Sequence, residues 1–261
     1  MKRLYRKKNN ALVYLGKKAN QEFWDSQWTN SKKKSFQKHS YVSTITKEYL
    51  KSGSTIIEGG CGRGNHVYSL SLNNFNAIGI DYADKTVIST LEEYPELDIR
   101  LGDVRNLDIG TGTIDGYWSL GVIEHFFDGY SEIASEIQRV LKSGGYIFLT
   151  FPTMSYLRKM KVKFGLFEVF QYEENQDFYQ YCLDPSLVIK DFESLGFSLV
   201  HETNMDGFKG LKDESPEFFK KFLQIIYDSD HFTAKIIKSG ISKFFSWYCG
   251  HVSLLILKKT S

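Results

Sequence analysis

The sequence predicts an α/β fold in which helices cover both faces of a doubly wound, mostly parallel sheet. Between residues 54 and 152, short apolar runs alternate with amphipathic runs of helical length, the pattern of successive βαβ units. Four glycines, in IIEGGCGRGN at residues 56–65, lie directly behind the first apolar run. Because ordered glycine costs backbone entropy, such a cluster indicates a backbone that turns sharply and admits close approach.

Each element of this alternation can be placed. Strands are expected at 54–58, 76–81, 97–103, 114–122 and 146–152, with helices at 64–74, 83–94 and 130–145. In the first helix, Val67, Leu70 and Leu72 are expected to face the core, and Asp84 is expected to cap the second helix. The alternation resumes late in the chain with a helix at 184–196 and strands at 197–203 and 250–259.

Two long stretches interrupt the alternation. Residues 153–183 are aromatic and irregular, and residues 207–249 carry helical patterns. Both are too long for ordinary connections, so we expect them to be helical and aromatic inserts that form a cap. We divide the chain into residues 1–50, a basic N-terminal arm with two lid helices, and residues 51–261, the main domain with its inserts.

The charge of the chain is unevenly distributed. Residues 1–40 hold eleven Lys and Arg against two acids, whereas the whole chain has a net charge of +2, so the remainder sums to −7. A basic arm can bind nucleic acid or an anionic membrane, but no nucleic-acid motif accompanies it. We expect residues 1–18, with seven Lys and Arg and no acid, to be a mobile tail that supports neither the fold nor ligand affinity.

Composition restricts the class of protein further. A chain of 261 residues with 42% hydrophobic content can form one domain with a sizeable core. No apolar run approaches the ~18 residues of a membrane-spanning helix, and the N-terminus lacks a secretory h-region. The three cysteines form no CxxC pair, which argues against a disulfide framework and a cysteine-built zinc site. We therefore expect a cytoplasmic protein.

The spacing of the glycines excludes two phosphate-binding loops. A dinucleotide fingerprint begun at Gly60 would need a glycine where Asn65 stands, and one begun at Gly62 would need it at Val67. The phosphate-cradling G-x-x-x-x-G-K-[ST] loop fails because no Gly-Lys pair follows. What remains is an acid-x-G-x-G-x-G loop that runs from Glu58 to Gly64.

This loop resembles motif I of the class I S-adenosylmethionine-dependent methyltransferases. AIGIDYA, RLGDVRNL, DGYWSLGVIEHFFDG and EIQRVLKSGGYIFLTFP resemble later motifs of that family in the same order, so the resemblance covers about residues 54–152. It implies a Rossmann-like seven-stranded sheet with five parallel strands and an antiparallel last strand. It also implies S-adenosyl-L-methionine as the cofactor and S-adenosyl-L-homocysteine as its product. The expected cofactor-binding residues are Glu58, Gly59, Gly60, Cys61, Gly62, Asp81, Tyr82, Asp103, Val104 and Leu120.

The resemblance assigns roles to the acids. Asp81 stands where the family holds the ribose hydroxyls, and Asp103 where it accepts the adenine amino group. This suits a cofactor without phosphate, because a diol and an amine call for carboxylates that accept strong hydrogen bonds. Glu58 could tie the amides of the loop, contact the cofactor, or do both. Trp24, Trp28 and Tyr41 could cover the cofactor or simply pack.

The segment after the fourth strand resembles the small-molecule branch, which includes ubiquinone-type O-methyltransferases and sugar- or polysaccharide-tailoring methyltransferases. The quinone enzymes use an acid three residues before the Glu-His pair for a divalent metal; here that residue is Gly121, so we expect no metal. His125 is the expected general base, with helix capping or substrate orientation as the alternatives. Glu124 is expected to point away from His125.

The sequence thus predicts an enzyme that methylates an oxygen, or with less support a nitrogen, of a small-molecule, sugar or lipid-linked acceptor. The alternatives are a non-catalytic cofactor-binding scaffold, which an aromatic plug beside His125 would favour, and an RNA methyltransferase that uses the basic arm. Residues 207–249 could complete the acceptor pocket, dimerise, or contact a membrane peripherally. The sequence identifies neither the acceptor nor the oligomeric state.

Overall fold

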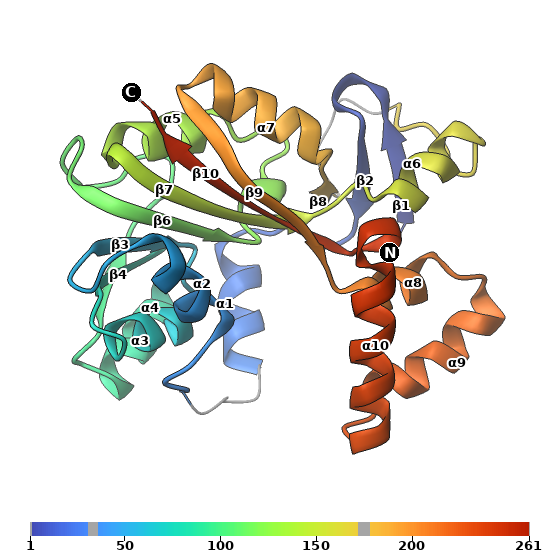
Figure 1. The fold of residues 1–261 in the computed structure, drawn as a ribbon, viewed down its shortest axis with the longest axis horizontal. Helices are drawn as coiled ribbons and strands as arrows, with labels where there is room; N and C mark the ends of the chain where they lie inside the picture. The colour runs from blue at the N-terminus through green and yellow to red at the C-terminus, as the bar shows by residue number, and fades with distance from the viewer. Residues whose placement is uncertain (1, 31–35, 172–177, 261) are drawn as a thin grey trace.

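The computed structural model describes residues 2–30, 36–171 and 178–260. These residues form a seven-stranded sheet (Figure 1), in the order β5 (Asp98–Leu101), β4 (Asn76–Asp81), β3 (Thr55–Gly59), β6 (Ile114–Leu120), β7 (Leu141–Pro152), β10 (Val252–Lys259) and β9 (Phe197–Met205). Strands β3 to β7 are parallel, and β10 is antiparallel to both of its neighbours. The predicted fold class is confirmed, including the antiparallel last strand.

Strand β7 differs most from its predicted bounds. It begins at Leu141 because helix α5 (Ser131–Val140) ends before the two glycines that were expected to stop it. Leu141 already pairs with Ile114, and a register shift follows before Tyr146 pairs with Gly116. Gly144 and Gly145 therefore lie in the irregular first part of β7 rather than at the end of a helix.

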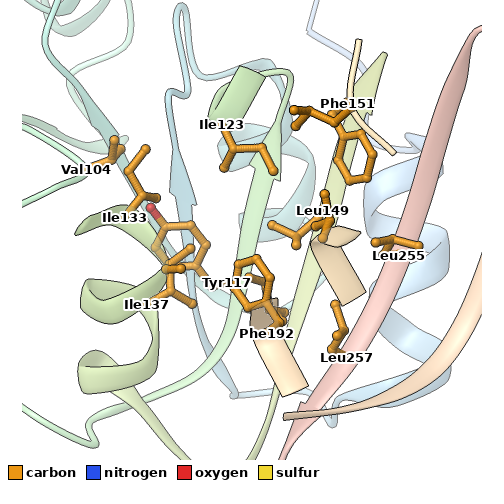
Figure 2. Close-up of a cluster of buried hydrophobic side chains, with 14 of the residues drawn as sticks. Val104, Tyr117, Ile123, Ile133, Ile137, Leu149, Phe151, Phe192, Leu255 and Leu257 are labelled. Atoms are coloured by element: carbon orange, nitrogen blue, oxygen red, sulfur yellow. The ribbon is translucent and has the colours of Figure 1, made fainter. Parts of the chain in front are cut away.

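Helices cover both faces of the sheet, as Figure 1 shows. One face carries α5 and α7 (Pro185–Ser194), and the other carries α2 (Tyr41–Tyr49), α3 (Asn65–Ser71) and α4 (Asp84–Glu93). Successive strand residues point to opposite faces, so neighbouring side chains enter different clusters. Tyr117 packs with the α5 and α7 cluster, whereas Trp118 packs in the other cluster. Figure 2 shows the first cluster, where Ile133, Ile137 and Phe192 meet apolar side chains of the sheet.

Two local predictions about the helices are wrong. Val67 and Leu70 are fully buried, but Leu72 is 42% exposed because α3 ends at Ser71. The cap of α4 is not Asp84, which lies inside the helix. Instead Asp25, on helix α1 (Gln21–Asn30), accepts hydrogen bonds from the backbone N–H and hydroxyl of Thr86 at 3.0 and 2.9 Å. A distant helix thus supplies the cap and is held against the sheet by it.

The expectation of a mobile N-terminal tail is also wrong. Strands β1 (Lys2–Arg6) and β2 (Ala11–Leu15) form an antiparallel hairpin, and β2 pairs with β8 (Phe178–Cys182) to make a second, three-stranded sheet. The apolar residues of the hairpin are buried, namely Leu4, Ala11, Leu12 and Val13. The second strand contains no basic residue, and the arginines of the first are held by the fold, Arg3 by Glu214 and Arg6 by Phe127 and Tyr181.

The two inserts form the right-hand end of the view in Figure 1. The first yields α6 (Tyr156–Lys163) and β8, and residues 172–177 of the predicted acceptor stretch lie outside the described residues. The second yields α8 (Gly207–Glu214), α9 (Glu217–Asp228) and α10 (Phe232–Cys249). Within the described parts of the chain, no helix combines the length and apolar character needed to cross a membrane.

A buried ion pair joins the inserts to the hairpin. Arg158 on α6 donates to Glu214 on α8 at 2.9 Å, and both side chains are completely buried. Arg3 on β1 and Lys161 on α6 donate to the same carboxylate at 2.5 and 2.8 Å. Burial opposes ionisation of Glu214, but Arg158 and Arg3 overcome it and lower the pKa of this carboxyl from 4.5 to about 2.

We predict that Glu214→Gln lowers the free energy of unfolding by about 3–5 kcal/mol at pH 7, because it leaves the buried Arg158 charge uncompensated. Urea denaturation followed by circular dichroism would measure the loss. Since Glu214 ionises more readily in the folded chain, its contribution should be present above about pH 4.5 and disappear as pH falls toward 2.

A matched control is Asp98→Asn, which removes the half-exposed pair between Asp98 and Arg100. Exposed pairs contribute at most about 1 kcal/mol, so this variant should unfold close to the wild type. Equal losses in the two variants would contradict a central role for the buried pair.

Candidate active site

The glycine loop lies where the carboxyl ends of β3, β4 and β6 meet. Gly60 and Gly62 have positive φ values of 73° and 52°, a region that side chains with a Cβ rarely occupy. A Cβ atom on Gly60 would lie 2.5 Å from Val122, and one on Gly62 would lie 2.4 Å from the ring of Trp28. Neighbouring groups thus approach the bare backbone of the loop closely, at the edge where open α/β sheets bind ligands.

Asp81, the last residue of β4, fixes this loop. Its carboxylate accepts hydrogen bonds from the backbone N–H of Gly62 at 2.7 Å and of Ala83 at 2.9 Å. Burial raises the pKa of Asp81, and the donated amides oppose the rise. A carboxylate has about four acceptor positions, so Asp81 can hold the loop and still accept from a ligand diol.

Glu58 lies directly behind the loop and is almost completely buried. The backbone N–H of Val67, in the first turn of α3, donates to its carboxylate, so Glu58 does tie backbone at the loop. Its Oε2 atom has no partner in the structure. Burial, followed by the nearby charge of Asp81, raises the pKa of Glu58 to about 8.

The other expected cofactor residues surround the loop at different depths. Gly59 packs against Tyr117, and the buried Cys61 thiol lies beside Gly79 and donates to the Gly62 carbonyl at 3.8 Å. Leu120 is half-buried in the cluster around Trp118, and Val104 is buried in the cluster on the opposite face of the sheet. These residues provide walls rather than polar contacts.

Asp103 and Tyr82 lie nearer to solvent. Arg105 donates three side-chain hydrogen bonds and one backbone hydrogen bond to the Asp103 carboxylate, the shortest at 2.6 Å, and they lower the pKa of Asp103. The Tyr82 hydroxyl donates to the carbonyl of Ala19 at 3.1 Å. Asp103 is therefore a partly exposed, paired acid, unlike the buried Asp81.

Helix α1 lies across this edge of the sheet. The Trp28 ring packs on Gly62, while Trp24 hydrogen-bonds Tyr82 and stands edge-on to the His125 ring, with centroids 5.0 Å apart. The two tryptophans thus bridge the glycine loop and the segment after β6. Tyr41, the third aromatic residue considered as a cover, instead meets His66 and Trp118 edge-on.

His125 closes the short 3-10 helix η2 (Ile123–His125). Its Nδ1 atom lies 2.8 Å from the carbonyl oxygen of Tyr179 on β8. A carbonyl can only accept, so we assign the proton to Nδ1, which leaves a lone pair on Nε2. Burial lowers the pKa of His125 to about 4, so the ring is neutral at pH 7.

Glu124 does not point away from His125, and this expectation is wrong. Its Oε1 atom lies 3.9 Å from His125 Nε2, because η2 is only three residues long and the chain is already extended at Phe126, so no regular helix holds the two side chains apart. Its Oε2 atom has no partner, and burial raises the pKa of Glu124 to about 8. A neutral imidazole and a protonated carboxyl therefore stand side by side at pH 7.

Aromatic rings enclose this pair. Trp24 and Tyr179 meet the His125 ring edge-on at 5.0 and 5.1 Å, and Phe23 contacts both of those aromatic residues. Among the described residues, no group of three or more His, Cys, Asp or Glu could hold a metal ion. The arrangement offers a proton acceptor and a proton donor between apolar walls.

Some contributors to this site were not predicted. Tyr179 lies in an insert without a motif, and Phe23 and Asp25 lie outside the region of resemblance. The one available signal was composition, because FWDSQW at residues 23–28 combines three aromatic residues with an acid in one helix-length run.

Comparisons with known proteins point to one family. The family model described as "Methyltransferase domain" matches residues 57–149. A probable S-adenosylmethionine-dependent methyltransferase from Mycolicibacterium smegmatis is 33% identical over 101 residues, which is 39% of this chain and 39% of that protein. The match to this relative therefore spans about two fifths of its length.

Solved structures extend the likeness to the whole fold. A SAM-dependent methyltransferase from Archaeoglobus fulgidus has a TM-score of 0.55 at 18% identity, over 84% of this chain and 93% of that one. An S-adenosylmethionine-dependent methyltransferase from Mesorhizobium loti has a TM-score of 0.56 at 11% identity, over 82% and 96%. The chain thus has the fold of the S-adenosylmethionine-dependent methyltransferases, with a segment at residues 57–149 that matches their methyltransferase domain.

Proposed function

We propose that this chain is a methyltransferase that uses S-adenosyl-L-methionine and methylates an oxygen of a small-molecule, sugar or lipid-linked acceptor. The observation that carries the proposal is the glycine loop held by Asp81 within the segment that matches the methyltransferase domain. The names of the matched relative and solved structures support the cofactor.

The residues at the loop fit this cofactor. Asp81 offers a buried carboxylate for a diol, and the unpaired Glu58 Oε2 atom offers an acceptor at the loop. The Trp28 ring packs directly on Gly62 and occupies the space in front of this glycine. The Trp28 ring would move away when a ligand binds there. The cofactor, when bound, supplies a methyl group on a sulfonium, which needs mainly alignment and exclusion of water.

On the acceptor side, His125 would take the proton of the acceptor hydroxyl. Its Nδ1–H is held by the Tyr179 carbonyl, so Nε2 is the basic atom. The carboxylate form of Glu124, 3.9 Å away, would stabilise the charged imidazole. The rings of Trp24 and Tyr179 limit the access of water to this step.

The N-terminal hairpin supports a small acceptor over RNA. Arg3 is committed to Glu214, and the guanidinium of Arg6 lies over the Phe127 ring at 4.8 Å and bonds the Tyr181 hydroxyl. Two of the basic residues are thus used in packing rather than presented to a phosphate backbone.

A second candidate is a cofactor-binding scaffold without catalytic activity. The aromatic rings packed around His125 favour it, because they fill the position at which an acceptor would stand. The two candidates share cofactor binding and differ in turnover.

Cofactor binding gives the first prediction of this proposal. S-adenosylhomocysteine should bind and NAD should not, and Asp81→Ala should weaken binding by about 1.5–3 kcal/mol, or roughly 10–150-fold, the range for hydrogen bonds to a charged group. Calorimetry would measure the affinities. Asp84→Ala is the matched control, since this acid lies one turn away in α4 and bonds only its neighbour's amide. Tight NAD binding, or equal affinities in the two variants, would refute the cofactor assignment.

Turnover gives the second prediction. His125→Ala should lower methyl transfer from labelled cofactor to a panel of phenolic, sugar and lipid-linked hydroxyl acceptors by about 10²–10⁴-fold, with cofactor affinity unchanged. Because the neutral imidazole is the active form and its pKa is lowered to about 4, the wild-type rate should rise with pH near 4 rather than near 6.5. His201→Ala, at an exposed site on β9, is the control. Full turnover in His125→Ala would reassign this residue to packing, and an inactive wild type that binds cofactor would favour the scaffold.

A further inference from the structure

Helices α9 and α10 expose large apolar side chains. Phe218 and Ile225 on α9 are 79% and 72% exposed, and Phe232, Phe244 and Trp247 on α10 are 73%, 74% and 69% exposed. The four aromatic rings alone leave on the order of 600 Å² open to solvent, given about 200 Å² for each ring residue. Patches of that size mark interaction sites on soluble proteins.

Five exposed apolar side chains of α10 share one face, and Phe245, 43% exposed, lies outside it. At about 100° per residue, Phe232, Ile236, Ile237, Phe244 and Trp247 fall within an arc of about 140°. The residues on the opposite side, Ala234 and Cys249, are buried against the rest of the molecule. A helix at the surface of a soluble protein normally turns such an apolar stripe inward. Helix α10 turns it outward, so the face is left uncovered by the described residues.

Helix α10 is basic, whereas the neighbouring α9 carries Glu217 and Asp228 beside its two lysines, and Glu202 on β9 lines the same hollow as Lys243 and Trp247. Helix α10 contains three lysines and no acid. Lys235 and Lys243 are exposed, while Lys238 is used inside the fold, where it donates to the carbonyls of Tyr227 and Ser229. On α9, Lys221 is exposed near Phe218 in the sequence. The partner that complements the face of α10 is therefore apolar and anionic.

We propose that the outward faces of α9 and α10 dock on an anionic lipid bilayer. Aromatic and aliphatic side chains beside lysines are typical of helices that lie in the membrane interface. The apolar rings would enter the boundary between headgroups and acyl chains, and Lys235 and Lys243 would contact anionic headgroups. Since no described helix can cross a membrane, the contact is peripheral.

A second copy of this chain fits the surface less well. A two-fold dimer places the same patch on both subunits, so α10 packed on α10 would bring lysines together without an acid of that helix between them. The lipid surface removes this repulsion and satisfies the apolar rings. This inference goes beyond the proposed methyl transfer and does not depend on it.

The test is vesicle flotation of the full chain. Vesicles of phosphatidylcholine with phosphatidylglycerol should bind the protein at low salt, and pure phosphatidylcholine vesicles should bind it about tenfold or more weakly. Phe232→Ser combined with Phe244→Ser and Trp247→Ser should reduce binding to the anionic vesicles by at least tenfold. Lys235→Glu with Lys243→Glu should weaken binding and remove most of its salt dependence.

The control is Ile88→Ser, which changes an exposed apolar residue of α4, a helix packed on the main sheet. This variant should bind vesicles as the wild type does. Melting temperature and S-adenosylhomocysteine affinity, measured for each variant, separate loss of docking from loss of folding. Absence of binding to anionic vesicles, unchanged binding in the triple variant, or a dimer in light scattering that the triple variant dissociates would overturn the proposal.

Discussion

The buried pair of Arg158 and Glu214 is the interaction on which the acceptor side of this molecule depends. Arg158 also donates to the carbonyl of Thr153 at 2.7 Å and to the Cys182 thiol at 3.2 Å. Cys182 ends β8, the strand whose Tyr179 carbonyl fixes the tautomer of His125. Arg158 thus anchors one end of the strand whose other end holds the Nδ1 atom of the proposed base.

The two sides of the site have different origins. The cofactor side is made by consecutive βαβ units, so Glu58, the glycine loop and Asp81 reach their places through local strand and helix geometry. The acceptor side is assembled from segments far apart in the sequence, namely β8, α1 and η2. The first arrangement is tolerant of change elsewhere, whereas the second requires the hairpin, both inserts and α1 to dock together.

This difference explains what the sequence could predict. The central strands of the main sheet, such as β3 and β6, are buried on both faces, and their apolar runs between turn residues identify them directly. The hairpin was missed because its first strand and its turn are rich in lysine and arginine, although ALVYL at residues 11–15 is a buried apolar run of strand length. The proximity of Glu124 to His125 depends on a helix that ends after three residues, and the capping role of Asp25 depends on the docking of α1. Neither is encoded in a local pattern.

The raised pKa values of two buried carboxyls, Glu58 and Glu124, show that the site lowers the stability of the folded chain at neutral pH. Burial raises the pKa values of Glu58 and Glu124 to about 8, so the folded chain holds these protons after the unfolded chain has released them. Stability therefore falls as pH rises from about 4.5 through 8, the reverse of the contribution of Glu214. A glutamine at either position would avoid this penalty, but it could not change its charge when His125 or a ligand does. Carboxyls that are buried, unpaired and costly are typical of sites that move protons or hold charged ligands, and both lie at the edge where the proposed reaction would take place.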